Sequence, residues 1–163
     1  MVIGGQAVLI YGEPRLTRDI DVTLGVDCDR LDAVEKAAGG LKLKSLVTNH
    51  RQFVIDTMTW PLLDKTSGMR VDFVFSNTPY ERAAIGRARS VQIGRTKVRF
   101  AAVEDIIVHK LVAARPRDLE DVRGILAKQP RYDKSYVKKW LKEFDRALEG
   151  GYLKAFEKLA KES

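Results

Sequence analysis

Two aspartates, Asp19 and Asp21, alternate with aliphatic residues near the start of the chain. Successive side chains of a β-strand point to opposite faces, so both carboxylates share one face while Ile20 and Val22 point into the core. Carboxylates this close repel each other unless a cation lies between them, and Mg²⁺ prefers hard oxygen ligands of this kind. The pattern predicts a metal-binding strand, and a solvated polar strand face is the alternative interpretation.

A glycine pair, Gly4-Gly5, ends a short apolar run upstream of these aspartates. Glycine lets the backbone approach a ligand closely, and a helix is predicted to follow over residues 6–11. A glycine turn that leads into a helix N-terminus is typical of phosphate-binding sites. The segment that connects this helix to the aspartates, with Arg15 and Thr17, is predicted to be a loop.

A third carboxylate, Asp72, interrupts a run of β-branched and aromatic residues that predicts a strand over residues 70–75. Burying a carboxylate costs several kcal/mol unless it is paired or binds a metal ion. Asp72 is therefore the third candidate metal ligand, with an exposed aspartate on an edge strand as the alternative. Other strands are predicted over residues 20–25, 52–58, 90–93 and 97–101, the last two as a hairpin.

From Val103 onward the spacing of apolar residues becomes helical. Helices are predicted over residues 103–114, 117–128, 134–148 and 151–161, in addition to an earlier one over residues 30–38. This layout predicts an α/β (α+β) fold, with a small mixed sheet, flanking helices and a C-terminal helical half. We expect a core over residues 1–101 and a helical part over residues 102–163, packed as a single compact unit.

Lys110 lies in the middle of the apolar arc of the helix predicted over residues 103–114. Such a lysine either extends past the edge of the core to solvent or provides a fixed cation for phosphate oxygens. Asp118 and Asp121 lie near the start of the next helix, where the helix dipole favours acidic side chains. Both could also reach Lys110 or a nearby arginine and hold it in place.

The composition describes a globular chain of 163 residues with 45% hydrophobic residues, a length that fits one domain. No apolar run approaches the length of a membrane-spanning helix. The single cysteine, Cys28, excludes a disulfide within the chain and fits a reducing compartment. We therefore expect a cytoplasmic protein that does not contact a membrane.

The net charge of +7 is unevenly distributed along the chain. Residues 1–82 contain 10 Lys/Arg and 11 Asp/Glu, whereas residues 83–163 contain 19 Lys/Arg and 11 Asp/Glu. A basic half of this kind suits a partner that carries phosphates, such as RNA. The alternative is that the lysine-rich helices only make the surface more soluble.

The chain resembles the DNA polymerase β-type nucleotidyltransferase superfamily in three motifs that occur in order: Val2-Ile3-Gly4-Gly5, Arg15-x-Thr17-x-Asp19-Ile20-Asp21-Val22 and Arg70-Val71-Asp72-Phe73-Val74. A later run, from Glu104 to Val122, resembles the AbiEii-type and minimal bacterial branch, which includes toxin–antitoxin nucleotidyltransferases. Together the motifs cover nearly the whole chain.

This resemblance implies a nucleotidyltransferase core, an NTP substrate and two Mg²⁺ ions. By position, Asp19 and Asp21 would bind metal beneath the phosphates. Asp72 would complete the second metal site nearest the attacking hydroxyl, and Lys110 would contact the triphosphate. The nucleotide-binding set would comprise Gly4, Gly5, Arg15, Thr17, Lys110, Asp118 and Asp121.

The acceptor of the transferred nucleotide is left open by the sequence. The basic second half favours RNA, above all a tRNA 3′ end. The alternatives are a protein side chain that receives AMP, a small molecule, and a non-catalytic protein that keeps the fold and binds a cognate toxin or antitoxin. Members of the group have a helix and a full strand before the glycine pair, so we expect a late start or a trimmed form, with a short first strand.

Overall fold

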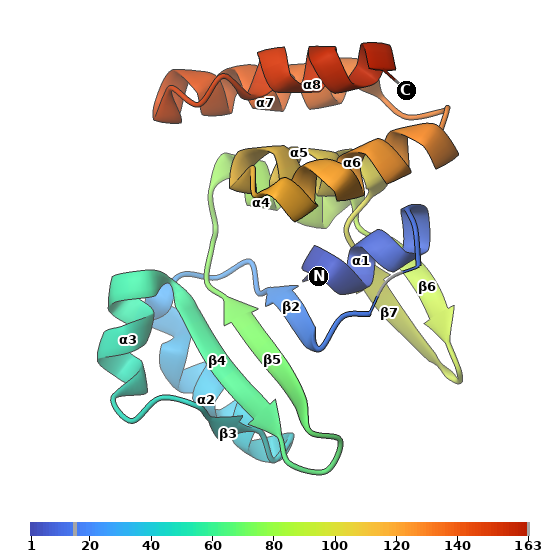
Figure 1. The fold of residues 1–163 in the computed structure, drawn as a ribbon. Helices are drawn as coiled ribbons and strands as arrows, with labels where there is room; N and C mark the ends of the chain where they lie inside the picture. The colour runs from blue at the N-terminus through green and yellow to red at the C-terminus, as the bar shows by residue number, and fades with distance from the viewer. Residues whose placement is uncertain (15, 163) are drawn as a thin grey trace. The chain divides into compact units, whose positions relative to one another are not determined.

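A computed structural model describes residues 1–14 and 16–162 and confirms the predicted α/β fold (Figure 1). The strands are β1 (Val2–Ile3), β2 (Asp19–Thr23), β3 (Lys44–Ser45), β4 (Thr59–Asp64), β5 (Met69–Val74), β6 (Arg89–Ile93) and β7 (Thr96–Phe100). The helices are α1 (Gly4–Tyr11), α2 (Leu31–Gly40), α3 (His50–Thr57), α4 (Pro79–Arg87), α5 (Val103–Ala113), α6 (Pro116–Lys128), α7 (Lys134–Leu148) and α8 (Tyr152–Glu162), with a short 3₁₀ helix, η1 (Cys28–Arg30).

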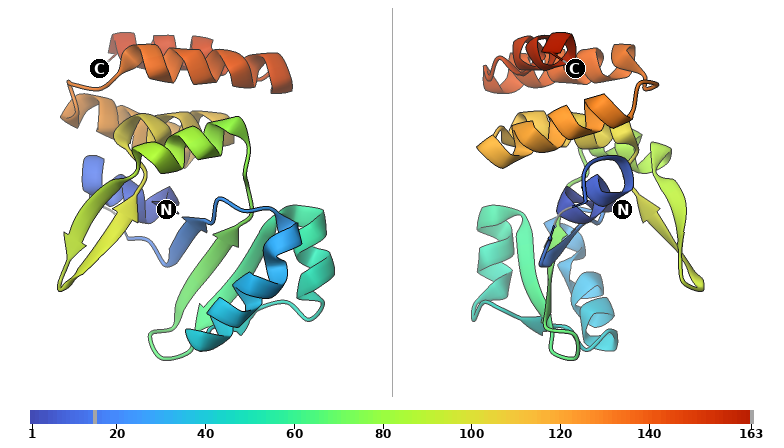
Figure 2. Two further views of the ribbon diagram at one scale, coloured as in Figure 1. Left: turned by 180° about the vertical axis from the view of Figure 1, so that it is seen from behind. Right: turned by 45° about the vertical axis from the view of Figure 1, so that its right-hand side comes forward.

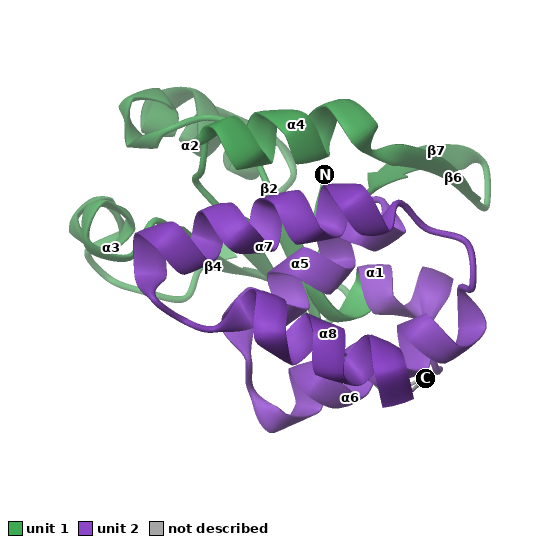
Figure 3. Ribbon diagram, turned by 90° about the horizontal axis from the view of Figure 1, so that it is seen from above, with its two compact units in different colours: residues 1–6, 16–100 green, residues 7–15, 101–163 purple. Residues whose placement is uncertain are grey.

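The chain forms two compact units, which Figure 3 colours separately. The first comprises residues 1–6 and 16–100, and the second comprises residues 7–15 and 101–163. The first unit therefore contains all the described strands, and the second contains helices α5 to α8. The expectation of one compact unit with a division after residue 101 stays a prediction.

A seven-stranded mixed sheet forms the first unit, in the order β3-β4-β5-β2-β1-β7-β6. Strand β2 pairs in parallel with β5 and antiparallel with β1, which in turn pairs in parallel with β7. The strand at the glycine pair, β1, has two residues, as expected from the sequence. Its position between β2 and β7 joins the two halves of the sheet.

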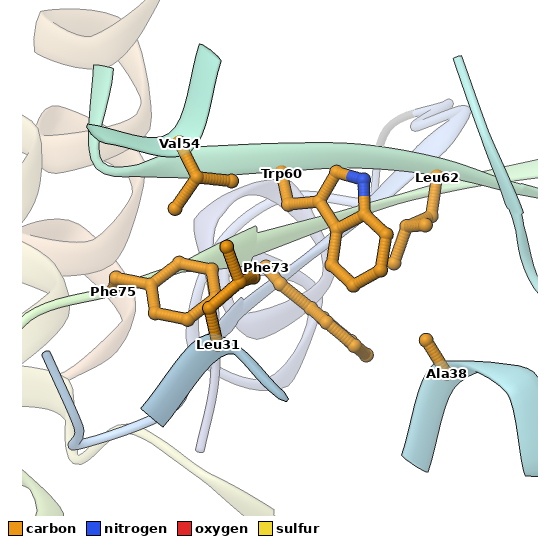
Figure 4. Packing of buried hydrophobic residues seen from close by; sticks show 7 residues of the cluster. All are labelled: Leu31, Ala38, Val54, Trp60, Leu62, Phe73 and Phe75. Atoms are coloured by element: carbon orange, nitrogen blue, oxygen red, sulfur yellow. The ribbon is translucent and has the colours of Figure 1, made fainter. Parts of the chain in front are cut away.

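One face of the sheet carries the hydrophobic core of the first unit (Figure 4). The buried cluster consists of Leu31, Ala38, Val54, Trp60, Leu62, Phe73 and Phe75, which come from α2, α3, β4, β5 and the residue after β5. Seen from behind, α2 lies in front of β4 and β5 (Figure 2). Val22 of β2 packs against the same cluster, so Asp19 and Asp21 lie on the opposite face of the sheet.

The prediction of a strand over residues 52–58 is wrong, because this segment lies in helix α3 and its C-cap. Short apolar runs do not distinguish strand from helix by periodicity alone. In the helix, side chains four residues apart are neighbours, and Gln52 Nε2 donates a hydrogen bond to Asp56 Oδ1 at 2.9 Å. Met58 ends the helix in a left-handed conformation, and its N–H donates to the Val54 carbonyl at 2.7 Å. The strand in this region is β4, which begins at the next residue.

Four elements went unpredicted, the short β3 and η1 as well as β4 and α4, and α4 has a clear sequence signal. Helix α4 begins at Pro79, after Thr78 as N-cap, and the Thr78 hydroxyl accepts a hydrogen bond from the Glu81 N–H. Thr-Pro-x-Glu combines an N-cap residue, proline at the first helical position and a capping-box glutamate. Strand β4 contains Pro61, a residue that argues against a central strand. The hairpin and the helices after residue 100 are confirmed, with no end shifted by more than one residue.

Helix α5 is the centre of the second unit, where it packs against α6, α7 and α8. Its buried apolar residues are Val103, Ile106, Ile107, Val108 and Leu111. Its buried carboxylates are bonded by the α7 region: Glu104 Oε1 accepts from the Asp133 N–H at 2.9 Å, and Asp105 Oδ1 accepts from the Tyr136 hydroxyl at 2.7 Å. No helix among the described residues is long and apolar enough to cross a membrane.

Candidate functional site

The three candidate carboxylates share one face of the sheet. In the parallel pairing of β2 with β5, Asp21 lies opposite Asp72, and in the antiparallel pairing with β1 it lies opposite Ile3. Residues paired across neighbouring strands point to the same face, and Asp19 is two residues from Asp21. All three carboxylates therefore face away from the hydrophobic core, each of them partly buried.

The backbone of the glycine turn approaches this face closely. Gly4 has a φ of +62°, a backbone conformation that residues other than glycine rarely adopt. A Cβ atom at Gly4 would lie 1.9 Å from Asp21 Oδ2, so the carboxylate occupies the space that a side chain would need. Gly5 follows in the first turn of α1 and is buried. The predicted glycine turn is therefore a place where backbone and carboxylate meet.

Hydrogen bonds hold two of the three carboxylates, those of Asp19 and Asp72. The Thr17 hydroxyl donates to Asp19 Oδ1 at 2.7 Å. Arg70 Nε donates to Asp72 Oδ1 at 2.8 Å, from a side chain that is 51% exposed to one that is 14% exposed. Arg15, predicted to bind nucleotide, lies outside the described residues.

Arg70 is a functional candidate that sequence reasoning missed. It lies opposite Asp19 in the pairing of β2 with β5 and two residues from Asp72, so its side chain joins the carboxylate face. The hydrogen bond to Asp72 raises the pKa of the Arg70 guanidinium, and the negative charge of Asp72 adds to this rise. Asp19 and Asp21 act in the same direction, whereas partial burial acts against it. The strand alternation in Arg-Val-Asp was the signal that could have identified it.

The carboxylate face fits a divalent cation in its donor chemistry. Within residues 1–14 and 16–162, no three His, Cys, Asp or Glu side chains lie close enough together to hold a metal ion. Thr17 donates a hydrogen bond to Asp19 Oδ1, and Arg70 donates one to Asp72 Oδ1. The donor set is nevertheless three hard oxygen ligands on one sheet face, beside a glycine whose missing side chain leaves room for Asp21.

Lys110 belongs to the second unit and is engaged there by two carboxylates. Its Nζ lies 2.7 Å from Asp118 Oδ1 and 2.9 Å from Asp121 Oδ2, and all three side chains are at most 6% exposed. Asp118 Oδ2 also accepts from Arg115 Nε at 2.6 Å. Lys110 therefore does not extend to solvent, and the two aspartates hold it as the sequence indicated.

The environment of Asp118 stabilises its charged form. Burial would raise the pKa of this carboxyl, but the hydrogen bonds from Arg115 and Lys110 outweigh burial and hold the pKa below its usual value. Asp118 also accepts from the Arg115 N–H at 3.2 Å, at the start of α6. The ion pairs thus connect the last turn of α5 to the first turns of α6.

Comparison with known proteins gives one match of fold and one of family. A search of curated protein sequences found no match. Among solved structures, the crystal structure of an antigenic nucleotidyltransferase-like protein from Paracoccidioides brasiliensis matches with a TM-score of 0.52 at 16% identity, over 94% of this chain and 83% of that chain. This likeness shows a shared fold.

The family assignment rests on the sequence over almost its full length. The family model described as nucleotidyl transferase AbiEii toxin, type IV toxin–antitoxin system, matches residues 2–159. This range includes the glycine turn, the three carboxylates and the ion pairs of Lys110. The chain belongs to the AbiEii nucleotidyl transferase toxin family.

Proposed function

We propose that this chain is a Mg²⁺-dependent enzyme that transfers NMP from an NTP to a hydroxyl group of RNA, with a tRNA 3′ end as the acceptor. The observation that carries the proposal is the placement of Asp19, Asp21 and Asp72 on one sheet face, against the backbone of Gly4. The family supports nucleotidyl transfer within a toxin–antitoxin system. A cytoplasmic location and a cognate antitoxin as partner belong to the same proposal.

The carboxylate residues would hold two Mg²⁺ ions, Asp19 and Asp21 beneath the phosphates and Asp72 on the side of the attacking hydroxyl. When bound, the ions would supply Lewis-acid stabilisation of the entering and leaving oxygens. Thr17 keeps Asp19 oriented through its hydrogen bond. Asp21 is positioned by the close approach of Gly4.

The reaction is an in-line displacement at the α-phosphorus. The acceptor oxygen forms a bond to the α-phosphorus, the bond from this phosphorus to the bridging oxygen breaks, and pyrophosphate leaves. The Asp72 carboxylate accepts the proton of the attacking hydroxyl. Little chemistry beyond positioning and charge neutralisation is required of the protein. Contact of Lys110 with the triphosphate stays a prediction, since its Nζ is bonded by Asp118 and Asp121.

The test is incubation of the purified protein with Mg²⁺, each α-³²P-labelled NTP in turn, total tRNA and a cell lysate. We expect label on RNA from the wild type and a loss of about 10²-fold or more in Asp72→Ala, because a general base of this kind contributes at least that much. Asp56→Ala is the matched control, since this exposed aspartate of α3 lies away from the carboxylate face.

Circular dichroism establishes that each variant is folded before its rate is compared. Transfer by Asp72→Ala at the wild-type rate would overturn the site assignment. Label on a protein band would replace RNA with a protein acceptor that receives AMP. No label on any acceptor, with a cognate partner supplied, would favour a non-catalytic binding protein.

A further inference from the structure

The positive charge of this protein is concentrated in one stretch of the first unit. Between Glu81 and Glu104 the sequence contains six Lys/Arg and no Asp/Glu. Four of these cations lie in the β6–β7 hairpin: Arg89, Arg95, Lys97 and Arg99. The hairpin is visible at the right-hand side of Figure 1. An uninterrupted positive stretch of this length attracts polyanions more strongly than the same number of cations spread among carboxylates.

The hairpin cations are exposed, and most of them have no acidic partner. Arg89, Arg95 and Lys97 are exposed and form no ion pair within the part of the chain that the structure describes. Arg99 is also exposed, and it donates a hydrogen bond to the Ile85 carbonyl at 2.5 Å. These charges are therefore available to a ligand from outside the chain.

The basic residues of the C-terminal helices differ in this respect. Lys138 of α7 bonds Glu157 of α8 at 2.8 Å, and Arg146 bonds Glu143 at 2.7 Å. Acidic neighbours offset part of the positive charge of these helices. The basic half seen in the sequence thus divides into mixed-charge helices and a hairpin without acidic residues.

Strand register determines which face of the sheet the hairpin cations occupy. Val2 of β1 pairs with Val22 of β2 on one side and with Phe100 of β7 on the other. Paired residues point to the same face, so buried Phe100 points to the face on which Val22 packs into the core. Side chains at odd-numbered positions of β7 therefore point to the opposite face.

Lys97 and Arg99 consequently lie on the same sheet face as the three carboxylates. Their partners in β6 are polar as well, since Lys97 pairs with Gln92 and Arg99 pairs with Ser90. Only β1 separates β7 from β2, which carries Asp21. Where Val2 of β1 pairs with both strands, Phe100 of β7 is roughly 10 Å from Val22 of β2, at about 4.8 Å between neighbouring strands.

Protection of a sheet edge accounts for only part of the charge of the hairpin. Charged side chains on edge strands prevent unwanted strand pairing, which would explain Arg89 on the edge strand β6. Strand β7 pairs with β6 along its whole length but with β1 only at Phe100, so edge protection could also explain Lys97. It does not explain Arg95, which lies in the exposed turn between the two strands.

We propose that the β6–β7 hairpin, through Arg95, Lys97 and Arg99, binds the sugar–phosphate backbone of the acceptor RNA. The proposal rests on the proposed function for its choice of RNA as the polyanion. The cations contact phosphates without reading bases, so binding is independent of sequence and weakens as salt is added. The hairpin is a binding surface beside the carboxylate face, within the same unit.

The experiment measures binding of fluorescently labelled tRNA and of an unrelated single-stranded RNA by anisotropy, over a series of KCl concentrations and without NTP. The variant is Arg95→Gln/Lys97→Gln, which removes two exposed charges. We expect weaker binding of both RNAs and a salt slope, log K against log salt, that falls by about 2, because each lost phosphate contact lowers it by about 1.

The matched control is Lys154→Gln/Lys158→Gln, which removes two exposed cations from α8. We expect its affinity and its salt slope to equal those of the wild type. An unchanged slope and affinity in the hairpin variant would overturn the proposal, and so would an equal loss in the α8 variant. Thermal melts of both variants establish that the comparison is made between folded proteins.

The outcomes separate this inference from the proposed function. If the wild type labels RNA and the hairpin variant binds RNA normally, the hairpin surface is wrong and nucleotidyl transfer stands. If the wild type labels no RNA while the hairpin variant loses RNA binding, the surface stands and the proposed reaction is wrong.

Discussion

At the carboxylate face, the backbone of Gly4 leaves no room for a side chain. A Cβ atom of Gly4 would lie 1.9 Å from Asp21 Oδ2, so the identity of one residue sets the position of the other. Arg70 lies on the same face and bonds Asp72, so it would compete with a metal ion for this carboxylate. Both relations are local and can be tested by single substitutions.

Gly4→Ala is expected to lower stability and activity for separate reasons. A left-handed φ at a residue other than glycine costs about 1–3 kcal/mol. The new methyl group also displaces the Asp21 carboxylate, and a misplacement of this kind can cost about 10²-fold in rate. Gly68→Ala is the control, because Gly68 has a φ of +70° but a Cβ atom added there would meet no other atom within 4 Å.

Urea unfolding and NMP transfer are measured for both glycine variants. We expect both variants to lose unfolding free energy, Gly4→Ala more because its methyl group also meets Asp21, and only Gly4→Ala to lose transfer. Equal transfer by the two variants would mean that the close approach to Asp21 does not position this carboxylate for the reaction.

Arg70→Gln is expected to strengthen the binding of a divalent cation to the carboxylate face. Arg70 competes with the metal for Asp72, and removal of its charge lowers the cost of bringing in another cation. Since the side chain is half exposed, solvent screening limits the gain to roughly fivefold in the dissociation constant, equivalent to about 1 kcal/mol.

The measurement is a titration with Mn²⁺ alone, followed by electron paramagnetic resonance. Lys44→Gln is the control, since Lys44 is an exposed cation of β3 in the same sheet. Weaker Mn²⁺ binding by Arg70→Gln would contradict the prediction and would mean that Arg70 helps to orient Asp72 for the metal.

At the scale of secondary structure, helix α5 carries charged groups into the interior of the second unit. Lys110 and its partners Asp118 and Asp121 form a buried ion-pair group that connects α5 to α6. Removing Lys110 would take away the buried cation that two buried carboxylates share, which is far more costly than the loss of an exposed ion pair. The lysine therefore has a structural role, whatever it contributes to nucleotide binding.

Lys110→Met is expected to lower the free energy of unfolding by about 3 kcal/mol, because Asp118 and Asp121 stay buried after losing the ammonium that both contact. Arg115 still pairs with Asp118 and keeps the loss at this lower end of the range. Lys128→Met removes a cation that bonds the exposed Glu13 at 2.8 Å and is expected to cost at most about 1 kcal/mol. Urea unfolding of the two variants makes the comparison. A loss below about 1 kcal/mol in Lys110→Met would contradict a structural role for this ion-pair group.

At the scale of the whole molecule, the basic residues and the candidate site residues are grouped differently in the structure than along the sequence. The net positive charge of the second half is shared by two units, since the hairpin belongs to the first and helices α5 to α8 belong to the second. The second unit also takes residues 7–15, which precede the carboxylate strand. Within the second unit, Tyr11 connects this early segment to the chain just before α5, because its hydroxyl donates to the Ala101 carbonyl at 2.9 Å.

Local patterns in the sequence predicted the carboxylate strand, the glycine turn and the helices after residue 100. These features depend on alternation, on the conformational freedom of glycine and on helical spacing, all of which act over a few residues. The family was also evident from the sequence, because its motifs consist of such local patterns. The helix over residues 50–57 was mistaken for a strand because an apolar run of this length fits both periods.

The pairing of strands required the tertiary structure. Asp21 lies opposite Asp72, Arg70 lies opposite Asp19, and Lys97 shares their face because of hydrogen-bond register between strands far apart in the chain. Register depends on the packing of every side chain on the two faces, and a shift of one residue would move each side chain to the other face. Sequence alone determined which residues could do the chemistry, whereas long-range packing determined which of them stand together.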